Sequence, residues 1–171
     1  MQHSIKVNCK SNGIDRYRLF DIVRRDEMNT DFEWMPGRDL VTLKRLAAER
    51  FEAIAKQETP DGITVEYRKQ LSGRAWVSIK KVSVPRPRTR RALHIYLHEI
   101  AHIVLDHRRQ KPRHVEEYEA ETWAFETMRK HGISVPRKSL QRAKQYVARK
   151  IQQAKARGAK RIDPKAKAFV K

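Results

Sequence analysis

The chain has 171 residues, with 39 Lys or Arg against 20 Asp or Glu, and its formal net charge is +19. This length suits one domain with its own core, and the single cysteine, Cys9, excludes an intramolecular disulfide. No apolar run reaches the roughly 18 residues of a membrane span, and the N-terminus lacks the apolar stretch of a signal peptide. We therefore expect a cytoplasmic protein whose charge favours anionic partners.

The first third of the chain predicts one clear helix. Residues 4–9 alternate weakly, as in an edge strand, and residues 17–23 fit a helix and a strand equally well. Residues 38–57 form an amphipathic pattern, which the turn around Pro60 ends. Its apolar residues recur at helical spacing: Leu40, Leu43, Leu46, Ala47, Phe51 and Ile54.

The middle of the chain predicts a hairpin followed by a buried helix. Residues 63–67 and 74–84 have the composition of two strands, joined around Leu71-Ser72-Gly73. Residues 89–107 then form a helix that is apolar on all sides, and such a helix is normally buried in the centre of a domain.

Two more helices follow. One covers roughly residues 114–131, and Gly132 suits its C-terminal cap. The next begins at Pro136 and runs to about residue 157, beyond which the chain is a basic tail without periodicity.

The central motif is His98-Glu99-Ile100-Ala101-His102, an HExxH sequence inside the predicted buried helix. Residues four apart lie on one face of a helix, so the two imidazoles can bind one metal ion. Glu99 projects from the adjoining face, where its carboxylate can take a proton from a zinc-bound water. Two histidines and a glutamate on an apolar helix are costly unless they are paired or bind a metal. The motif therefore predicts a zinc hydrolase with Glu99 as its catalytic base.

A catalytic zinc usually has three protein ligands, so a third must come from elsewhere. His107 is expected at the end of the helix as a surface residue or a partner of its dipole. His114 is a possible ligand beside a loop, and the next helix offers four acidic residues: Glu116, Glu117, Glu119 and Glu121.

Helical spacing favours Glu117 among these acids. Glu117 and Glu121 share one stripe with Ala120 and Ala124, whose small side chains allow a close approach to the HExxH helix. Glu117 is thus the predicted third ligand, and Glu121 is expected to accept a hydrogen bond from a ligating histidine. The alternative for the whole acidic run is a solvated helix N-terminus, stabilised by the helix dipole.

Other residues near these motifs have weaker predictions. Glu116 and Glu119 fall on other helix faces and are expected to be exposed. His94, one turn before His98, is expected either to line the cleft and support the ligands or to be an ordinary core or surface residue. The aromatic residues of the helix at residues 114–131, Trp123, Tyr118 and Phe125, are expected to pack around the site. The group that stabilises an oxyanion is open. Its candidates are Tyr118, His94 and His131.

These motifs resemble those of the ImmA/IrrE metallopeptidases, gluzincin-type proteins of bacteria, phages and mobile elements. The resemblance is carried by His98-Glu-Ile-Ala-His102 and Glu117-Tyr-Glu-Ala-Glu-Thr-Trp-Ala124, within residues 63–136. It departs from the family pattern at Glu121, where Asp or Asn is frequent, and in the segment from Glu126 to His131. The resemblance implies a zinc peptidase that cleaves a protein substrate, typically a helix-turn-helix transcriptional repressor.

The C-terminal segment, residues 137–171, carries a dense set of basic residues with Asp163 as its one acid. An apolar stripe on its helical part predicts that this helix docks on the domain and exposes a basic face. Lys and Arg on such a face bind phosphates without sequence preference, whereas the alternative is a solubilising tail. The candidate nucleic-acid contacts are Arg142, Arg149 and Lys150.

Together these patterns predict an α+β, zincin-like domain over residues 1–136, with residues 1–37 uncertain, followed by the basic segment. A small antiparallel sheet or hairpin is expected to pack on the central HExxH helix. The predicted activity is zinc-dependent endopeptidase cleavage, with His98, His102 and Glu117 as metal ligands. The alternative is a nucleic-acid-associated accessory protein that keeps the scaffold without protease activity, although such a protein does not need Glu99.

Overall fold

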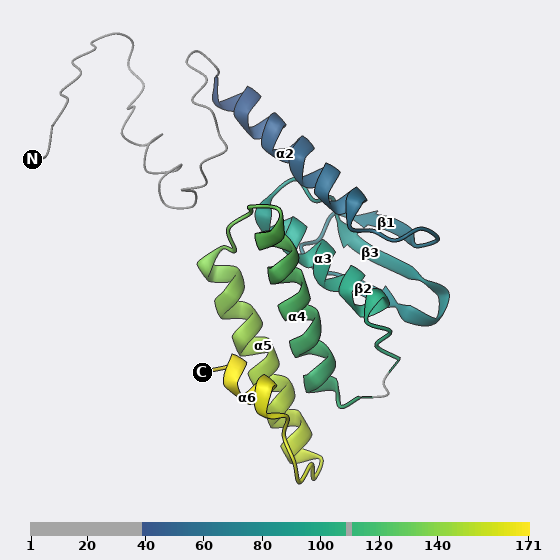
Figure 1. Ribbon diagram of the computed structural model, residues 1–171, viewed down its shortest axis with the longest axis vertical. Coiled ribbons are helices and arrows are strands. Elements are labelled where there is room, and N and C mark those ends of the chain that lie inside the picture. Colours follow the sequence, from purple (N-terminus) through teal and green to yellow (C-terminus); the bar gives the residue numbers. More distant parts are fainter. Residues whose placement is uncertain (1–38, 109–110) are drawn as a thin grey trace, which may run out of the picture.

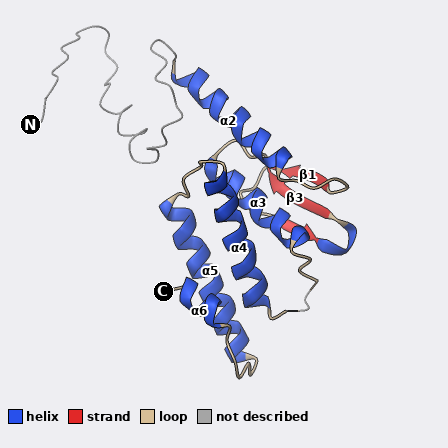
Figure 2. Ribbon diagram, in the orientation of Figure 1, coloured by secondary structure: helices blue, strands red, loops and turns tan. Residues whose placement is uncertain are grey.

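A computed structural model of the chain describes residues 39–108 and 111–171. Within these ranges the protein is α+β, as predicted, with five α-helices and one small three-stranded sheet (Figures 1 and 2). No helix in the described ranges is long and apolar enough to cross a membrane. The predictions for residues 4–9 and 17–23, and Cys9 itself, lie outside the described residues.

Helix α2, Leu40–Gln57, confirms the first predicted helix. It begins where the Oδ1 atom of Asp39 accepts a hydrogen bond from the Thr42 N–H at 2.7 Å, which caps an otherwise unpaired donor. The last turns of α2 bury Phe51 and Ile54 in the main core. The helix therefore anchors by its C-terminal half.

The sheet consists of β1 (Thr64–Arg68), β2 (Arg74–Trp76) and β3 (Lys81–Pro85), in the order β1-β3-β2. Strand β1 pairs with β3 in parallel, and β2 pairs with β3 in antiparallel. The sheet is thus small and mixed, with β3 at its centre.

The predicted hairpin between residues 63–67 and 74–84 is wrong. A 3-10 turn at Val77–Ile79 and a left-handed Lys80, with φ of +48°, break the second segment into β2 and β3. The two pieces fold back on each other, and β1 is left to pair on the other side of β3. Because β3 lies against the central helix, its Val82 and Val84 are fully buried.

Helix α3, Arg90–Val104, is the central helix and carries the HExxH motif. It begins at Thr89, whose Oγ1 accepts a hydrogen bond from the Ala92 N–H at 3.1 Å. The sheet and α2 pack on one part of its surface and α4 on another (Figure 1). Four of its large apolar side chains join the core: Leu93, Tyr96, Leu97 and Ile100.

Helix α3 ends earlier than the predicted residue 107. Asp106 adopts a left-handed conformation with φ of +51°, and the His107 N–H donates to the His102 carbonyl at 2.9 Å. This pattern is a Schellman turn, which reverses the chain at the end of a helix. It returns His107 to the side of His102.

The remaining helices are α4 (Arg113–Lys130), α5 (Arg137–Ala156) and α6 (Pro164–Phe169). Gly132 caps the end of α4 with φ of +67°, as predicted. Helix α4 packs on α3 with one side and on α5 and α6 with another (Figure 1).

The C-terminal segment has its own small apolar cluster. Val147 and Ile151 of α5 pack with Ala166 of α6. The carboxylate of Asp163 caps α6 by accepting a hydrogen bond from the Ala166 N–H at 2.9 Å. The prediction of a tail without regular structure was wrong, since six residues of it form α6. Only one small side chain of α6, that of Ala166, is buried, so the lysine-rich sequence has no visible apolar periodicity.

Candidate metal centre

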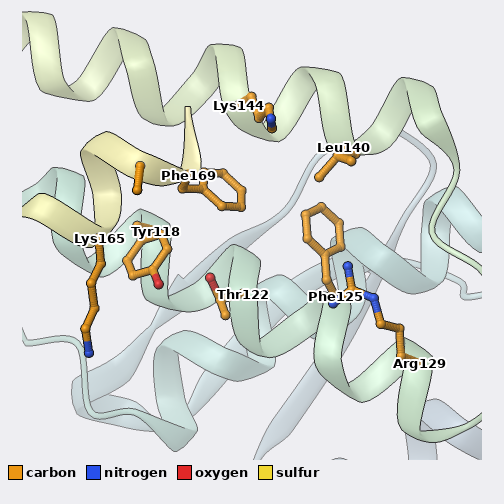
Figure 3. Close-up of a pocket in the computed structure, with 9 residues that line it drawn as sticks. Tyr118, Thr122, Phe125, Arg129, Leu140, Lys144, Lys165 and Phe169 are labelled. Carbon is orange, nitrogen blue, oxygen red and sulfur yellow. The ribbon is translucent and has the colours of Figure 1, made fainter. Parts of the chain in front are cut away.

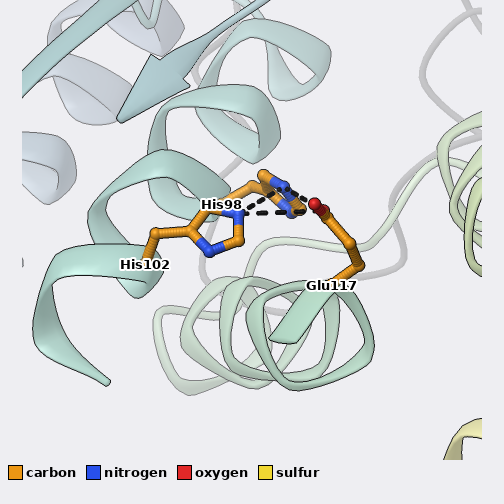
Figure 4. Close-up of side chains that lie close together, drawn as sticks. All are labelled: His98, His102 and Glu117. Atoms are coloured by element: carbon orange, nitrogen blue, oxygen red, sulfur yellow. Dashed lines mark hydrogen bonds and ion pairs between the residues drawn. The ribbon is translucent and has the colours of Figure 1, made fainter. Parts of the chain in front are cut away.

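Three donor atoms converge between α3 and α4. The Nε2 atoms of His98 and His102 are 3.3 Å apart. The Oε2 atom of Glu117 lies 3.3 Å from the Nε2 of His98 and 3.7 Å from that of His102 (Figure 4). These three side chains form a group that could hold a metal ion. Residues predicted from spacing alone are therefore brought together.

The size of this triangle fits a small cation. Ligand atoms at 2.0–2.2 Å from a tetrahedral ion are separated by roughly 3.3–3.6 Å. Two of the three separations, both 3.3 Å, fall on those edges, and the third, 3.7 Å, is slightly longer. Three protein donors leave the fourth position of a tetrahedron open, as in a catalytic site.

The surroundings of His98 leave its Nε2 free to bind. Its Nδ1 faces the Oε1 atom of Glu121 at 3.5 Å without a hydrogen bond in the described part of the chain, and the charge of this carboxylate favours a ring proton on Nδ1. Glu121 is fixed in turn by His94, whose Nε2–H donates to Oε2 at 2.7 Å. His94 stacks on the ring of Phe125 with centroids 4.7 Å apart. Glu121 thus lies beside His98, but its hydrogen bond is with His94 and not with the candidate ligand.

His102 is held by two hydrogen bonds in series, through His107 to Glu119. Its Nδ1 lies 2.8 Å from the Nδ1 of His107, and the Nε2 of His107 lies 3.0 Å from the Oε2 of Glu119. Because Glu119 accepts a hydrogen bond from the Nε2–H of His107, the Nδ1 of this neutral ring is an acceptor. The Nδ1–H of His102 therefore donates to it, and the Nε2 lone pair of His102 points at His98 and Glu117. Two facing lone pairs 3.3 Å apart repel unless a cation or a proton lies between them.

Glu117 is held at its other oxygen. The Nη2 atom of Arg113, one turn earlier on α4, contacts Oε1 at 2.6 Å, and this leaves Oε2 to face the two histidines. Although burial alone would raise the pKa of Glu117, contacts with His102, His98 and Arg113 hold it well below its usual value. The carboxylate is therefore ionised throughout the physiological range.

The charges of the cluster act on His98 and on Tyr146 of α5. Burial alone would lower the pKa of His98, but the carboxylates of Glu121 and Glu117 outweigh it and raise the pKa to about 9. Burial and the negative charge of Glu117 raise the pKa of Tyr146 to about 12, so its hydroxyl remains a donor beside that carboxylate. Without a metal ion, a proton on the histidine pair balances the acids.

Glu99 is buried beside the three donors and has no hydrogen-bond or ion-pair partner among the described residues. Burial raises its pKa, against the opposing effect of His98 and His102. Its side chain lies against the backbone of Gly73, just before β2, where a Cβ atom would overlap the Glu99 carboxyl group. An unpaired buried carboxylate with a raised pKa is suited to accept and return a proton.

Several sequence predictions around the cluster were wrong. Glu116 was expected in solvent but is 1 % exposed and pairs with Arg113 at 3.1 Å. Of the two predictions for His107, a surface residue or a partner of the helix dipole, the first is wrong, because His107 is 5 % exposed. Glu119, also expected in solvent, is half-buried and accepts hydrogen bonds from His107 and Lys111. In each case the close packing of α4 on the end of α3 covers a face that helical periodicity alone leaves open.

The remaining candidates lie away from the three donors. His114 is buried, and its Nε2 accepts a hydrogen bond from the Asp163 N–H at 3.4 Å, so it belongs to the contact with α6. Tyr118 packs edge-to-face on Phe169, and His131 contacts Glu58 at 2.6 Å. Tyr146 was missed because its sequence context, a basic helix, contains no sign of proximity to the motif.

The predicted nucleic-acid contacts lie on α5. Arg142 and Arg149 are exposed, and Lys150 is half-buried. The guanidinium of Arg149 and the ammonium of Lys150 lie 5.6 and 5.0 Å from the centre of the Tyr146 ring. This part of α5 therefore borders the group that could hold a metal ion, through Tyr146.

Comparison of the chain with protein-family models, with curated proteins and with solved structures finds no match. The resemblance to the ImmA/IrrE metallopeptidases therefore stays a prediction from the two motifs.

Proposed function

We propose that the protein is a zinc-dependent metalloendopeptidase that hydrolyses a peptide bond in a protein substrate. The observation that carries the proposal is the triangle of Nε2, Nε2 and Oε2 atoms with an unpaired Glu99 carboxylate beside it. A set of two imidazoles and one carboxylate fits zinc. The groups behind the histidines, Glu121 facing His98 and His107 hydrogen-bonded to His102, are of the kind that support metal ligands.

Each residue of the site has a separate role in the proposed reaction. His98, His102 and Glu117 would hold the ion, which when bound supplies a Lewis acid for water and for the substrate carbonyl. Glu99 takes the proton of the attacking water on its carboxylate and returns it to the leaving amine. Arg113, in contact with the Oε1 atom, and the nearby hydroxyl of Tyr146 orient Glu117 and keep its charge directed at the histidines.

The proposed substrate is a helix-turn-helix repressor of a phage or mobile element. The motif resemblance supports this class, through His98-Glu-Ile-Ala-His102 and the segment from Glu117 to Ala124. We also propose a cytoplasmic location, which the presence of a single cysteine supports.

The test is the substitution Glu99→Gln, which removes the proton acceptor and keeps the side-chain volume. We expect the variant to bind zinc like the wild type but to lose at least about a hundredfold in cleavage of denatured casein or of a helix-turn-helix repressor. Glu126→Gln, an exposed acid on α4, is the matched control and should cleave normally. Cleavage by Glu99→Gln at the wild-type rate would overturn the mechanism. A wild-type protein that holds zinc but cleaves neither substrate would favour the accessory role.

A second candidate function is nucleic-acid binding by the C-terminal segment. Residues 137–171 contain thirteen basic residues and one acidic residue, a net charge of +12 out of +19 for the chain. Most of these cations are exposed on α5, on α6 and between them. The full chain should therefore retard duplex DNA of any sequence in a gel, with an affinity that falls steeply as salt rises. Binding that is insensitive to salt would exclude this role.

A further inference from the structure

A surface cavity lies on a different face of α4 from Glu117. Here α4, α5 and α6 line an open cavity of about 450 Å³ (Figure 3). This volume is within the usual range of small-molecule sites, about 300–1,000 Å³. Nothing in the proposed peptidase mechanism uses this cavity.

The walls of the cavity are aromatic. Tyr118 and Phe169 stand on one side, and Phe125 and Leu140 on the other, with Thr122 between them (Figure 3). Tyr118 and Phe169 pack edge-to-face with ring centroids 5.5 Å apart. Such walls favour a flat apolar group, because aromatic pairs add offset or edge contacts to the burial of apolar area.

The rim of the cavity is cationic and unneutralised. One basic residue comes from each helix: Arg129 from α4, Lys144 from α5 and Lys165 from α6. Within the described ranges none of the three has a carboxylate partner. By contrast, the neighbouring Lys130 is paired with Glu58 at 2.9 Å. Three unpaired cations around an apolar floor complement a ligand that is both apolar and negatively charged.

Thr122 supplies a free hydroxyl at the centre of the cavity. Its Oγ1 atom is buried and makes no hydrogen bond within the described part of the chain. Leaving a buried hydroxyl unpaired costs about 1–3 kcal/mol, and a polar group of a bound ligand would remove that cost. The hydroxyl lies between the aromatic walls (Figure 3).

We propose that this cavity binds a small aromatic anion of the size of a nucleoside monophosphate. The ring of the ligand lies between Phe169 and Leu140, above Phe125, and its anionic group meets Lys144 and Arg129. Phe125 also stacks on His94, which holds Glu121 behind the metal-binding histidines. The floor of the cavity therefore adjoins the network that supports the metal-binding group.

The test is calorimetric titration of the full chain with adenosine monophosphate near physiological salt. We expect saturable binding that the double variant Arg129→Gln/Lys144→Gln weakens at least about tenfold, since each charge-assisted contact is lost. The matched control, Lys138→Gln/Lys155→Gln, removes two exposed charges of α5 outside the cavity and should bind within about twofold of wild type. Both pairs lie on helix surfaces, and their folding is checked by thermal melting.

Three results would overturn the proposal. The first is the absence of saturable binding by the wild type. The second is an equal loss in the control variant, which would mean that only the net charge attracts the nucleotide. The third is inorganic phosphate binding as tightly as adenosine monophosphate, which would exclude recognition of the ring. Binding of the phosphate at the metal centre is distinguished by its indifference to Arg129→Gln/Lys144→Gln.

Discussion

The α3–α4 interface and the α5–α6 pair differ in where their charged side chains lie. Between α3 and α4, histidines and glutamates are buried, and most of them face a specific partner. On α5 and α6 the charges lie mainly in solvent, and the buried positions are small or apolar: Ser139, Ala143, Val147, Ile151 and Ala166. Burying a charge is costly unless it is paired, whereas a charge in water needs no partner. The properties of the α3–α4 interface should therefore change when a single atom is replaced, whereas those of α5 and α6 should follow their total charge.

The largest expected effect comes from Glu117→Gln, which breaks the buried region at one atom. The amide keeps the volume but loses the charge that faces both histidines and Arg113. We expect zinc affinity to fall by more than about a hundredfold, beyond the range for residues that only support a ligand. Competition with a chelator measures it. An unchanged affinity would move the third ligand elsewhere.

The pH dependence of metal binding should be nearly as large. The raised pKa of His98, about 9, means that the metal-free protein carries a proton there at neutral pH. Zinc must displace this proton, so its affinity should rise about tenfold per pH unit from pH 7 and level off near pH 9. The same raised pKa stabilises the metal-free fold below its ordinary value of 6.5, and this stabilisation is lost as pH rises through 9. Titrations in buffers of different ionisation enthalpy count the proton, and release of none would contradict the assignment.

A smaller effect is expected from Glu121→Gln, which weakens the support of His98 without removing a ligand. Outer carboxylates of this kind typically contribute 10- to 100-fold in metal affinity. The same chelator competition applies, with the exposed Glu126→Gln on α4 as the matched control. If both variants bind zinc equally well, the contact between Glu121 and His98 has no role in metal binding.

The smallest effect should follow from Arg142→Gln on α5. This side chain is exposed, so the free energy of unfolding should change by less than about 0.5 kcal/mol. If the residue contacts a phosphate, the slope of DNA affinity against salt should fall by about one. Chemical denaturation and salt-dependent binding isotherms check the two statements. A loss of several kcal/mol in stability would show that the contrast between the two regions is false.

Much of this arrangement could be predicted from local spacing. Residues four apart share a helix face, which is enough to bring His98 beside His102 and to place Glu117 and Glu121 on one buried stripe of α4. The end of α4 was also predictable, because Gly132 favours the left-handed conformation that ends this helix. These features depend only on neighbours within two turns of the chain.

Contacts between distant segments were decided by the tertiary structure alone. The parallel pairing of β1 with β3 depends on how Lys80 turns the chain, and the burial of His107 depends on the turn at Asp106. Tyr146 reaches Glu117 only because α5 packs on α4. The sequence by itself thus determined the α+β class and the identity of the three converging donors, because helical periodicity is a local property. It could not determine what surrounds them, because that depends on packing between elements far apart in the chain.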